Sequence, residues 1–567
     1  MATGISRWVA DSAEYRPDRY YTYAHLTEML NNWQSQYPQL ISIESIGKTY
    51  QGRDIWAAIV TNTATGHHAD KPATFLDSNI HAGEVTGQAT VLWLLNHLLN
   101  GYGNDETVTS LLNRVTLYAV PGIMLDGIEL YLTTAERTRS SVRYYPETDL
   151  QDGLQREDMD GDGRILQMRV RDSAGAWKKH PEDSRIMIPR GPDERGGEYY
   201  SVFEEGQIQN WDGGKIAVAK EKFGLDLNRN FPRIWGPEWE QNGAGEYPFS
   251  DPETKALAEF LFAHPNIGTA QHLHTWSAVI LRPSVNQTDA DMNQADLAIY
   301  KAIGKMGEDE TGYPCVSIHD GFAYDKKKAI TGTVLDWVYE TFGAYAFSTE
   351  LWSLPRQAGA KITDFINWSK EHSPDEELAM AKVLDEHAEG EGIFAWKPFT
   401  HPQLGEIEIG GWDYKFAFQN PPGSLLEEVT AGNALFVQRM MGVLPQLEIE
   451  SVKIEHLGGD VYTVGAVVKN DGFLATYVSQ VGKKTAKIKP PKLVLTGAEI
   501  AIGKDEVEID HLEGRAALYH PLDTPPRSGN LARGYAEWVV KAKAGDQITI
   551  TGRSSKAGIA SATVTVE

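Results

Sequence analysis

Hydrophobic positions in the first 390 residues switch repeatedly between two periods. Apolar residues at every third or fourth position predict amphipathic helices, and short continuous apolar runs predict buried strands. The predicted helices cover residues 22–36, 88–99, 251–263, 289–308 and 333–342, and the predicted strands cover 41–46, 55–61, 73–76, 115–123, 267–274 and 344–352. This alternation favours an α/β fold with a mixed, mainly parallel central sheet flanked by helices.

One predicted helix has a recognisable start. Ser250 and Glu253 are spaced as in a capping box, in which the Ser side chain caps the helix and the Glu side chain reaches back to it. We therefore expect Ser250 to be the N-cap of the helix that ends at residue 263.

Two stretches depart from this alternation. Residues 140–223 are rich in Asp, Gly and Pro and have little periodicity, which predicts a long surface insertion. Residues 396–445 contain Pro and Gly clusters with a helix around 432–441, which indicates a connector packed on the first domain.

The pattern changes again near residue 446. Short strands separated by turns such as Asn470-Asp471-Gly472 predict a C-terminal all-β sandwich. The expected organisation is a first domain over residues 1–395, the connector over 396–445, and an accessory sandwich over 446–567.

Composition and charge restrict the class of protein. The chain has 567 residues, of which 41% are hydrophobic, and its formal net charge is −25. Residues 446–567 contain 15 Lys and Arg against 15 Asp and Glu, so the rest of the chain carries the whole negative charge. This charge argues against nucleic acid and anionic membranes as partners, and its uneven distribution supports a domain boundary near 446.

The sequence also indicates in which cellular compartment the protein is expected. Cys315 is the single cysteine, which excludes intramolecular disulfides. We expect no membrane insertion and no signal peptide, because no apolar run is long enough and residues 1–19 lack a basic start followed by an apolar core. The protein is then cytoplasmic, or secreted or periplasmic if a leader was trimmed; the oligomeric state is not predicted.

Candidate chemistry lies where predicted strands end. His81 and Glu84 follow one strand, His274 ends a second, and Glu350 lies near the end of a third. Open α/β sheets bind ligands at the carboxyl ends of their strands. Two imidazoles and a carboxylate form a donor set for Zn²⁺ that leaves one position open for water.

Other residue types near these positions suit hydrolysis. Glu350 is suited to take a proton from a metal-bound water and deliver it to a leaving amine. Asn228 and Arg229 offer an amide and a forked guanidinium for a substrate carboxylate. His272 lies two positions before His274 on the same side of its strand and competes with it as a ligand.

A second candidate metal site lies in the predicted insertion. Asp158, Asp160 and Asp162 alternate with other residues and are followed by Gly163, which is typical of a calcium loop. Arg169 stands at the twelfth position, where such loops carry a bidentate Glu. The sequence thus predicts a structural Ca²⁺ site, with a solvated acidic turn as the alternative.

Taken together, these motifs resemble the zinc carboxypeptidases of the carboxypeptidase A type, over roughly residues 20–390. The resemblance rests on four motifs in this order: His81-x-x-Glu84, Asp226-x-Asn228-Arg229, His274-Thr275-Trp276 and Thr349-Glu350-Leu351. It implies His81, Glu84 and His274 as ligands of one catalytic Zn²⁺, Glu350 as general base, and Asn228 and Arg229 as the clamp on the C-terminal carboxylate of a peptide. It also implies an arginine that stabilises the oxyanion, for which Arg139 is the best match and Arg143 the alternative.

The chain departs from the family pattern at three positions. Gly83 stands where the family commonly has an arginine before the metal-binding Glu. The family's substrate-capping tyrosine aligns with Lys328, while Tyr324 is nearby but shifted. Leu335 occupies a position that helps to set the side-chain pocket, which favours neutral or apolar C-terminal residues.

The resulting prediction is a zinc-dependent metallocarboxypeptidase, a hydrolase that acts on the C-termini of peptides or proteins. Three alternatives remain open: a zinc amidohydrolase of the aspartoacylase or desuccinylase type acting on N-acyl amino acids, a cell-wall peptide hydrolase, and an inactive peptide-binding homologue.

Overall fold

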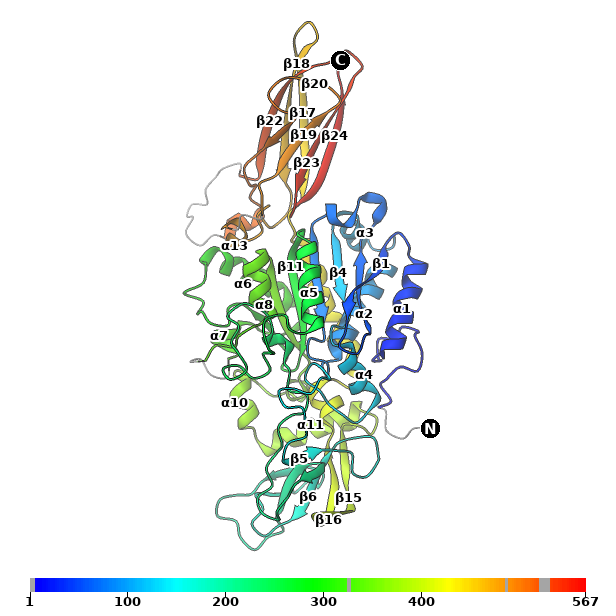
Figure 1. Ribbon diagram of the computed structural model, residues 1–567, viewed down its shortest axis with the longest axis vertical. Coiled ribbons are helices and arrows are strands. Elements are labelled where there is room, and N and C mark those ends of the chain that lie inside the picture. Colours follow the sequence, from blue (N-terminus) through cyan, green and yellow to red (C-terminus); the bar gives the residue numbers. More distant parts are fainter. Residues whose placement is uncertain (1–5, 324–327, 485–487, 520–530) are drawn as a thin grey trace.

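The computed structural model describes residues 6–323, 328–484, 488–519 and 531–567, and an eight-stranded sheet forms its centre (Figure 1). Four of the seven strand pairings are parallel, which confirms the predicted mixed, mainly parallel sheet. In their order across the sheet the strands are β1 (Ile41–Lys48), β2 (Asp54–Val60), β4 (Thr116–Val120), β3 (Ala73–Ser78), β11 (Ile267–Thr275), β14 (Tyr345–Leu351), β12 (Val279–Arg282) and β13 (Cys315–Ser317).

Helices cover both faces of this sheet, so that every residue of β3 and β11 is buried. Helices α2 (Thr86–Gly101) and α12 (Gly423–Gly442) pack together on one face, and α5 (Pro252–Ala263) and α8 (Val334–Phe342) pack on the other. The other helices are α1 (Tyr23–Gln36), α3 (Glu106–Arg114), α4 (Leu125–Thr133), α6 (Gln294–Thr311), α7 (Ile318–Gly321), α9 (Leu354–Gln357), α10 (Phe365–Lys370), α11 (Pro374–His387) and α13 (Gln480–Lys484).

The start of α5 differs from the sequence-based expectation. Asp251 rather than Ser250 is the N-cap, and its side chain makes no capping hydrogen bond. The Glu253 carboxylate instead accepts a hydrogen bond of 2.8 Å from the Tyr50 amide. The predicted capping box is wrong because a contact from a distant part of the chain engages Glu253.

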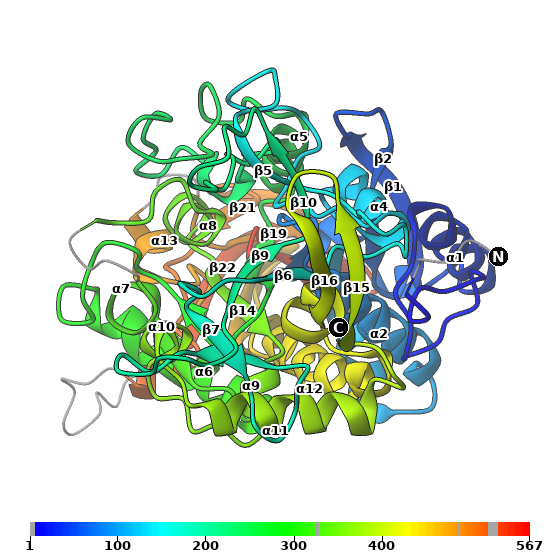
Figure 2. The same ribbon diagram turned by 90° about the horizontal axis from the view of Figure 1, so that it is seen from below.

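A second sheet combines two stretches that the sequence pattern left irregular. Its strands, in order, are β15 (Ile393–His401), β16 (Gly405–Trp412), β6 (Gln167–Arg171), β9 (Tyr200–Glu204), β7 (Trp177–Lys179) and β8 (Met187–Pro189), and β5 (Gly153–Arg156) pairs separately with β10 (Gly206–Gln209). The stretch expected as a connector therefore supplies strands to the insertion. Figure 2 shows this sheet in the foreground when the molecule is seen from below.

The C-terminal region is an all-β sandwich, as predicted. One sheet contains β17 (Leu447–Gly458), β18 (Val461–Asn470), β22 (Arg533–Lys541) and β20 (Glu499–Ile502), and the other contains β21 (Glu506–Glu508), β19 (Lys492–Thr496), β23 (Gln547–Ser554) and β24 (Gly558–Thr565). Their facing side chains form a separate hydrophobic core.

The sandwich contacts the central sheet far from the candidate chemistry. The buried Lys556 Nζ donates a hydrogen bond of 2.5 Å to the carbonyl oxygen of Ile267, the first residue of β11. His274 lies near the other end of the same strand, so Lys556 of the sandwich and His274 lie at opposite ends of β11. Across the described residues, no helix combines the length and apolar character needed to cross a membrane.

Candidate active site

The loop between β3 and α2 carries His81 and Glu84. Asn79 follows β3 with φ of 58°, a left-handed conformation that Asn tolerates better than most residues. Its Nδ2 donates a hydrogen bond of 2.9 Å to the carbonyl oxygen of Glu84, which closes the loop on itself. His81 and Glu84 are both buried.

His274 and Glu350 come from neighbouring parallel strands. The two residues stand opposite each other in the register of β11 and β14. Since β3 is the other parallel neighbour of β11, the ends of three strands bring His81, Glu84, His274 and Glu350 to one edge of the sheet.

Three of these side chains converge through their polar atoms. His81 Nδ1 lies 3.0 Å from Glu84 Oε1, His274 Nδ1 lies 3.1 Å from Glu84 Oε2, and the two Nδ1 atoms are 3.1 Å apart. Two ring nitrogens and a carboxylate that face one point match the donor set of a zinc site. His274 Nε2 is buried and has no hydrogen-bond partner among the described residues. The residues present therefore fit the metal that the family resemblance implies.

The protonation states of the two carboxyl groups, Glu84 and Glu350, depend on their charged neighbours. Burial by itself would raise the pKa of Glu84, but the neighbouring His81 and His274 outweigh it and hold that pKa at about 2. Burial raises the pKa of Glu350 well above its usual range, and repulsion from Glu84 adds to this effect. A cation held between the three side chains would favour the ionised form of both carboxyl groups.

Asp226 contacts the ring nitrogen of His81 that does not face Glu84. Its Oδ1 accepts a hydrogen bond of 3.0 Å from His81 Nε2, and its Oδ2 accepts one of 3.1 Å from Arg139 Nε. Asp226 is also the N-cap of the short 3₁₀ helix η3 (Leu227–Arg229), which positions Asn228 and Arg229. A carboxylate on the second ring nitrogen is the usual way in which a metal-binding histidine is oriented. In the sequence, Asp226 stands out only as part of the motif Asp226-x-Asn228-Arg229, which by itself indicates no role for it.

The structure also separates the residues that the sequence left as alternatives. Arg139 Nη1 lies 3.6 Å from Glu84 Oε1, whereas Arg143 pairs with Glu246 and Asp251. Of the two histidines, His274 joins the candidate metal group, while His272 Nδ1 contacts Asp77 Oδ2 at 2.9 Å in the core.

A cavity of about 350 Å³ opens over the group. Asn228 and Arg229 line it, and Asn228 Oδ1 accepts a hydrogen bond of 2.9 Å from the Val334 amide at the start of α8. The next residue, Leu335, contributes to an apolar part of the wall together with Leu281, Ile318, Phe322 and Ile330. Tyr324 lies outside the described residues, and Lys328 is exposed and is not part of the lining.

Several lining residues come from parts of the chain that sequence reasoning did not connect with the site. Trp276 packs edge-on against Phe365 and Phe418. Tyr414 and Gln419 also line the cavity. Trp276 belongs to the His274-Thr275-Trp276 motif, whereas no local signal in the sequence marked Phe365, Tyr414 or Gln419.

The acidic loop has a different geometry from the one expected. Asp158, Asp160 and the buried Glu205 come together, and Asp162 lies outside this group. Asp158 accepts hydrogen bonds of 2.8 Å from the amides of Gly161 and Gly163. Glu205 accepts bonds from two further backbone amides. Calcium binding at Asp158, Asp160 and Asp162 stays a prediction.

Comparison with known proteins gives two matching family models. The one described as zinc carboxypeptidase matches residues 26–366, and a domain of unknown function, DUF8731, matches residues 446–565. Among curated relatives, carboxypeptidase A2 of Mus musculus is 36% identical over 347 residues, and carboxypeptidase A2 of Rattus norvegicus is 23% identical over 349 residues. Each alignment covers 59% of this chain and 62% or 63% of the relative, so the chain spans less than two thirds of the relatives' length.

Solved structures give weaker likenesses. Thrombin activatable fibrinolysis inhibitor is 16% identical with a TM-score of 0.44 and covers 76% of both chains. Carboxypeptidase A from Helicoverpa armigera is 16% identical with a TM-score of 0.39 and covers 66% of this chain and 76% of its own.

The zinc carboxypeptidase model spans more than half of the chain and contains the four motifs from which the resemblance was inferred. The chain belongs to the zinc carboxypeptidase family.

Proposed function

We propose that this protein is a metallocarboxypeptidase that removes the C-terminal residue of peptides. The observation that carries the proposal is one cavity that contains a zinc-type donor set, the half-buried Glu350 carboxylate and two arginines. His81, Glu84 and His274 would hold Zn²⁺, which when bound activates water and polarises a carbonyl group.

The other residues have roles that follow from their positions. Asn228 and Arg229 bind the C-terminal carboxylate of the peptide through an amide and a forked guanidinium. This anchors the peptide beside the apolar wall that includes Leu335, and we therefore expect neutral or apolar C-terminal residues to be preferred. Tyr324 is proposed on the family resemblance alone as a group that covers the bound substrate.

Glu350 and Arg139 act on the scissile peptide bond. The Glu350 carboxylate takes a proton from the attacking water and delivers it to the leaving amine. The Arg139 guanidinium, held by Asp226 and Glu84, stabilises the negative charge that develops on the scissile carbonyl oxygen.

The test compares Glu350→Gln with the unchanged protein, both loaded with zinc, on N-blocked dipeptides and N-acyl amino acids. We expect the unchanged protein to release C-terminal residues from the dipeptides, and the variant to be slower by at least about 1,000-fold with its zinc retained. Glu44→Gln, an exposed position on β1, is the matched control and should keep full activity.

Two results would overturn the proposal. Hydrolysis of N-acyl amino acids without release of residues from dipeptides would point to the amidohydrolase. Stoichiometric zinc and tight peptide binding without any turnover would point to an inactive peptide-binding homologue.

A further inference from the structure

A short segment beyond the residues matched by the family model reaches into the candidate active site. Residues 414–419 form η4 (Tyr414–Gln419), a six-residue π-helical turn between β16 and α12. Its first and last residues, Tyr414 and Gln419, line the cavity that also contains His81, Glu84 and His274. Turns of this kind are rare and often occur at functional sites.

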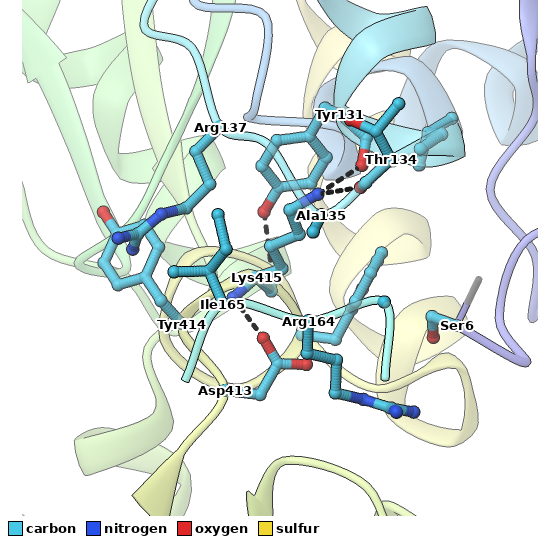
Figure 3. Close-up of a pocket in the computed structure, with 13 residues that line it drawn as sticks. Ser6, Tyr131, Thr134, Ala135, Arg137, Arg164, Ile165, Asp413, Tyr414 and Lys415 are labelled. Atoms are coloured by element: carbon cyan, nitrogen blue, oxygen red, sulfur yellow. Dashed lines mark hydrogen bonds between the residues drawn. The ribbon is translucent and has the colours of Figure 1, made fainter. Parts of the chain in front are cut away.

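The near end of this turn is fixed to the C-terminal end of α4, as Figure 3 shows. Lys415 Nζ donates hydrogen bonds of 2.6 and 2.7 Å to the carbonyl oxygens of Tyr131 and Thr134. The Asp413 carboxylate accepts a bond of 2.9 Å from the Lys415 amide. The Arg137 guanidinium lies 4.6 Å from the centre of the Tyr414 ring, within the range of a cation–π interaction.

The far end of the turn is fixed to the loop that carries His81 and Glu84. The buried Asn420 donates a hydrogen bond of 2.8 Å from Nδ2 to the carbonyl oxygen of Gly83. Its Oδ1 accepts bonds of 3.0 and 2.8 Å from the amide and hydroxyl of Thr86. Asn420 thereby joins the turn to both sides of Glu84.

These anchors place the Gln419 amide directly beside Gly83. A Cβ atom at position 83 would lie 3.0 Å from both Nε2 and Oε1 of Gln419 and 2.8 Å from the Tyr131 ring. Such contacts are too close for most side chains, so glycine at 83 leaves this space to Gln419. Gln419 Oε1 accepts a hydrogen bond of 3.0 Å from the Tyr131 hydroxyl, and Nε2 has no acceptor among the residues that the structure describes.

Gln419 and the carboxylate clamp line the same cavity from different elements. Asn228 is bonded to Val334 beside the apolar wall, whereas Gln419 contacts Gly83, which immediately precedes Glu84. Because Gly83 adjoins Glu84 and all four side chains line one cavity, a peptide held by Asn228 and Arg229 with its scissile bond at Glu84 has Gln419 within the same cavity for its upstream part.

We propose that Gln419 Nε2 donates a hydrogen bond to the main-chain carbonyl group that lies next upstream of the scissile one. The segment 413–420 then forms the subsite for the upstream part of the peptide, with the Tyr414 ring as its wall. This inference rests on the proposed carboxypeptidase function.

The test measures peptide binding rather than turnover. In a zinc-loaded Glu350→Gln background, calorimetry gives Kd for an N-acyl amino acid, which lacks the upstream carbonyl, and for an N-acyl dipeptide with the same C-terminal residue. We expect Gln419→Ala to weaken binding of the dipeptide about fivefold to tenfold, the value of one hydrogen bond, and binding of the acyl amino acid by less than about twofold.

Further variants keep the test specific. Gln419→Leu preserves side-chain volume without the donor and should behave like Gln419→Ala, and Gln36→Ala on the exposed end of α1 should change neither Kd. An unchanged Kd for the dipeptide, or an equal loss for both ligands, would overturn the inference. Failure of the carboxypeptidase proposal shows separately, as absence of turnover by the protein with Glu350 intact.

Discussion

The group of His81, Glu84 and His274 and the acidic loop around Asp158 both bring three metal-ligating side chains together. In each group the ligand atoms lie within 4.8 Å of one another. They differ in what else those atoms contact. Among the described residues, the two Nδ1 atoms of the first group contact each other and Glu84, whereas the carboxylates of the loop already accept several hydrogen bonds from backbone amides.

This difference matters because burying a polar atom without a hydrogen-bond partner lowers the stability of the folded state. A carboxylate that accepts hydrogen bonds from the backbone amides of its own turn does not carry this cost. A cation at the centre of the first group would give its ring nitrogens a partner besides Glu84. In the second group, backbone amides already bind the carboxylates of Asp158 and Glu205. Proximity of ligand side chains is therefore a weaker indication of a metal site than the lack of other partners for their atoms.

The largest effect is expected from removing one ligand of the first group. His274→Ala should abolish stoichiometric zinc and lower peptidase activity by at least about 1,000-fold, because three protein ligands are needed for a catalytic site. Zinc is measured by elemental analysis after dialysis. His272→Gln is the matched control: it should keep its zinc, although loss of the contact with Asp77 lowers its melting temperature. Loss of zinc in that variant alone would reverse the assignment.

A smaller effect is expected when the support of one ligand is removed. Asp226→Asn leaves all three candidate ligands in place but weakens the hold on His81 Nε2. Zinc affinity, measured by competition with a chromophoric chelator, should fall about 10-fold to 100-fold. Asp77→Asn alters the corresponding contact of His272 and should leave zinc affinity unchanged. Equal affinities in the two variants would show that Asp226 does not support a ligand.

Candidate site residues close to the ends of strands could be predicted from the sequence. Residues that line the site but belong to distant parts of the chain could not. The apolar runs of β3, β11 and β14 indicated a parallel sheet, and the position of His81 and Glu350 at strand ends followed from that sheet. The roles of these residues remain proposals. His272 and His274 lie on one side of the same strand, so strand position alone did not separate them; the family motif favoured His274, and the structure brings His274 to the candidate metal group.

Long-range contacts account for the parts that the sequence did not reveal. Gln419 reaches the cavity through the anchors of Asn420, more than three hundred residues away from Gly83 along the chain. Glu205 joins the acidic loop although forty-five positions separate it from Asp160. Glu253 was expected to take part in a capping box, but its carboxylate accepts a hydrogen bond from the Tyr50 amide instead. Periodicity and local motifs carry no information about such contacts.

The smallest effect concerns Glu205 in the acidic loop. Burial raises the pKa of its carboxyl group to about 7, with smaller contributions from the nearby Asp160 and Asp158. A carboxyl group with a raised pKa in the folded state contributes stability that is fully present below its unfolded pKa of about 4.5 and is lost as the pH rises through about 7. Glu205→Gln should therefore gain stability relative to the unchanged protein by about 1–3 kcal/mol between pH 5 and pH 8.

Denaturant unfolding at both pH values measures this difference, with the exposed Glu204→Gln as the matched control that should show almost none. Repeating the series with millimolar Ca²⁺ tests the calcium prediction. A cation bound beside Glu205 would favour its ionised form, so Ca²⁺ should stabilise the unchanged protein at pH 8 and reduce the advantage of Glu205→Gln. If added Ca²⁺ changes neither protein, the loop is an acidic turn closed by its own backbone amides, and the contrast with the His81, Glu84 and His274 group becomes complete.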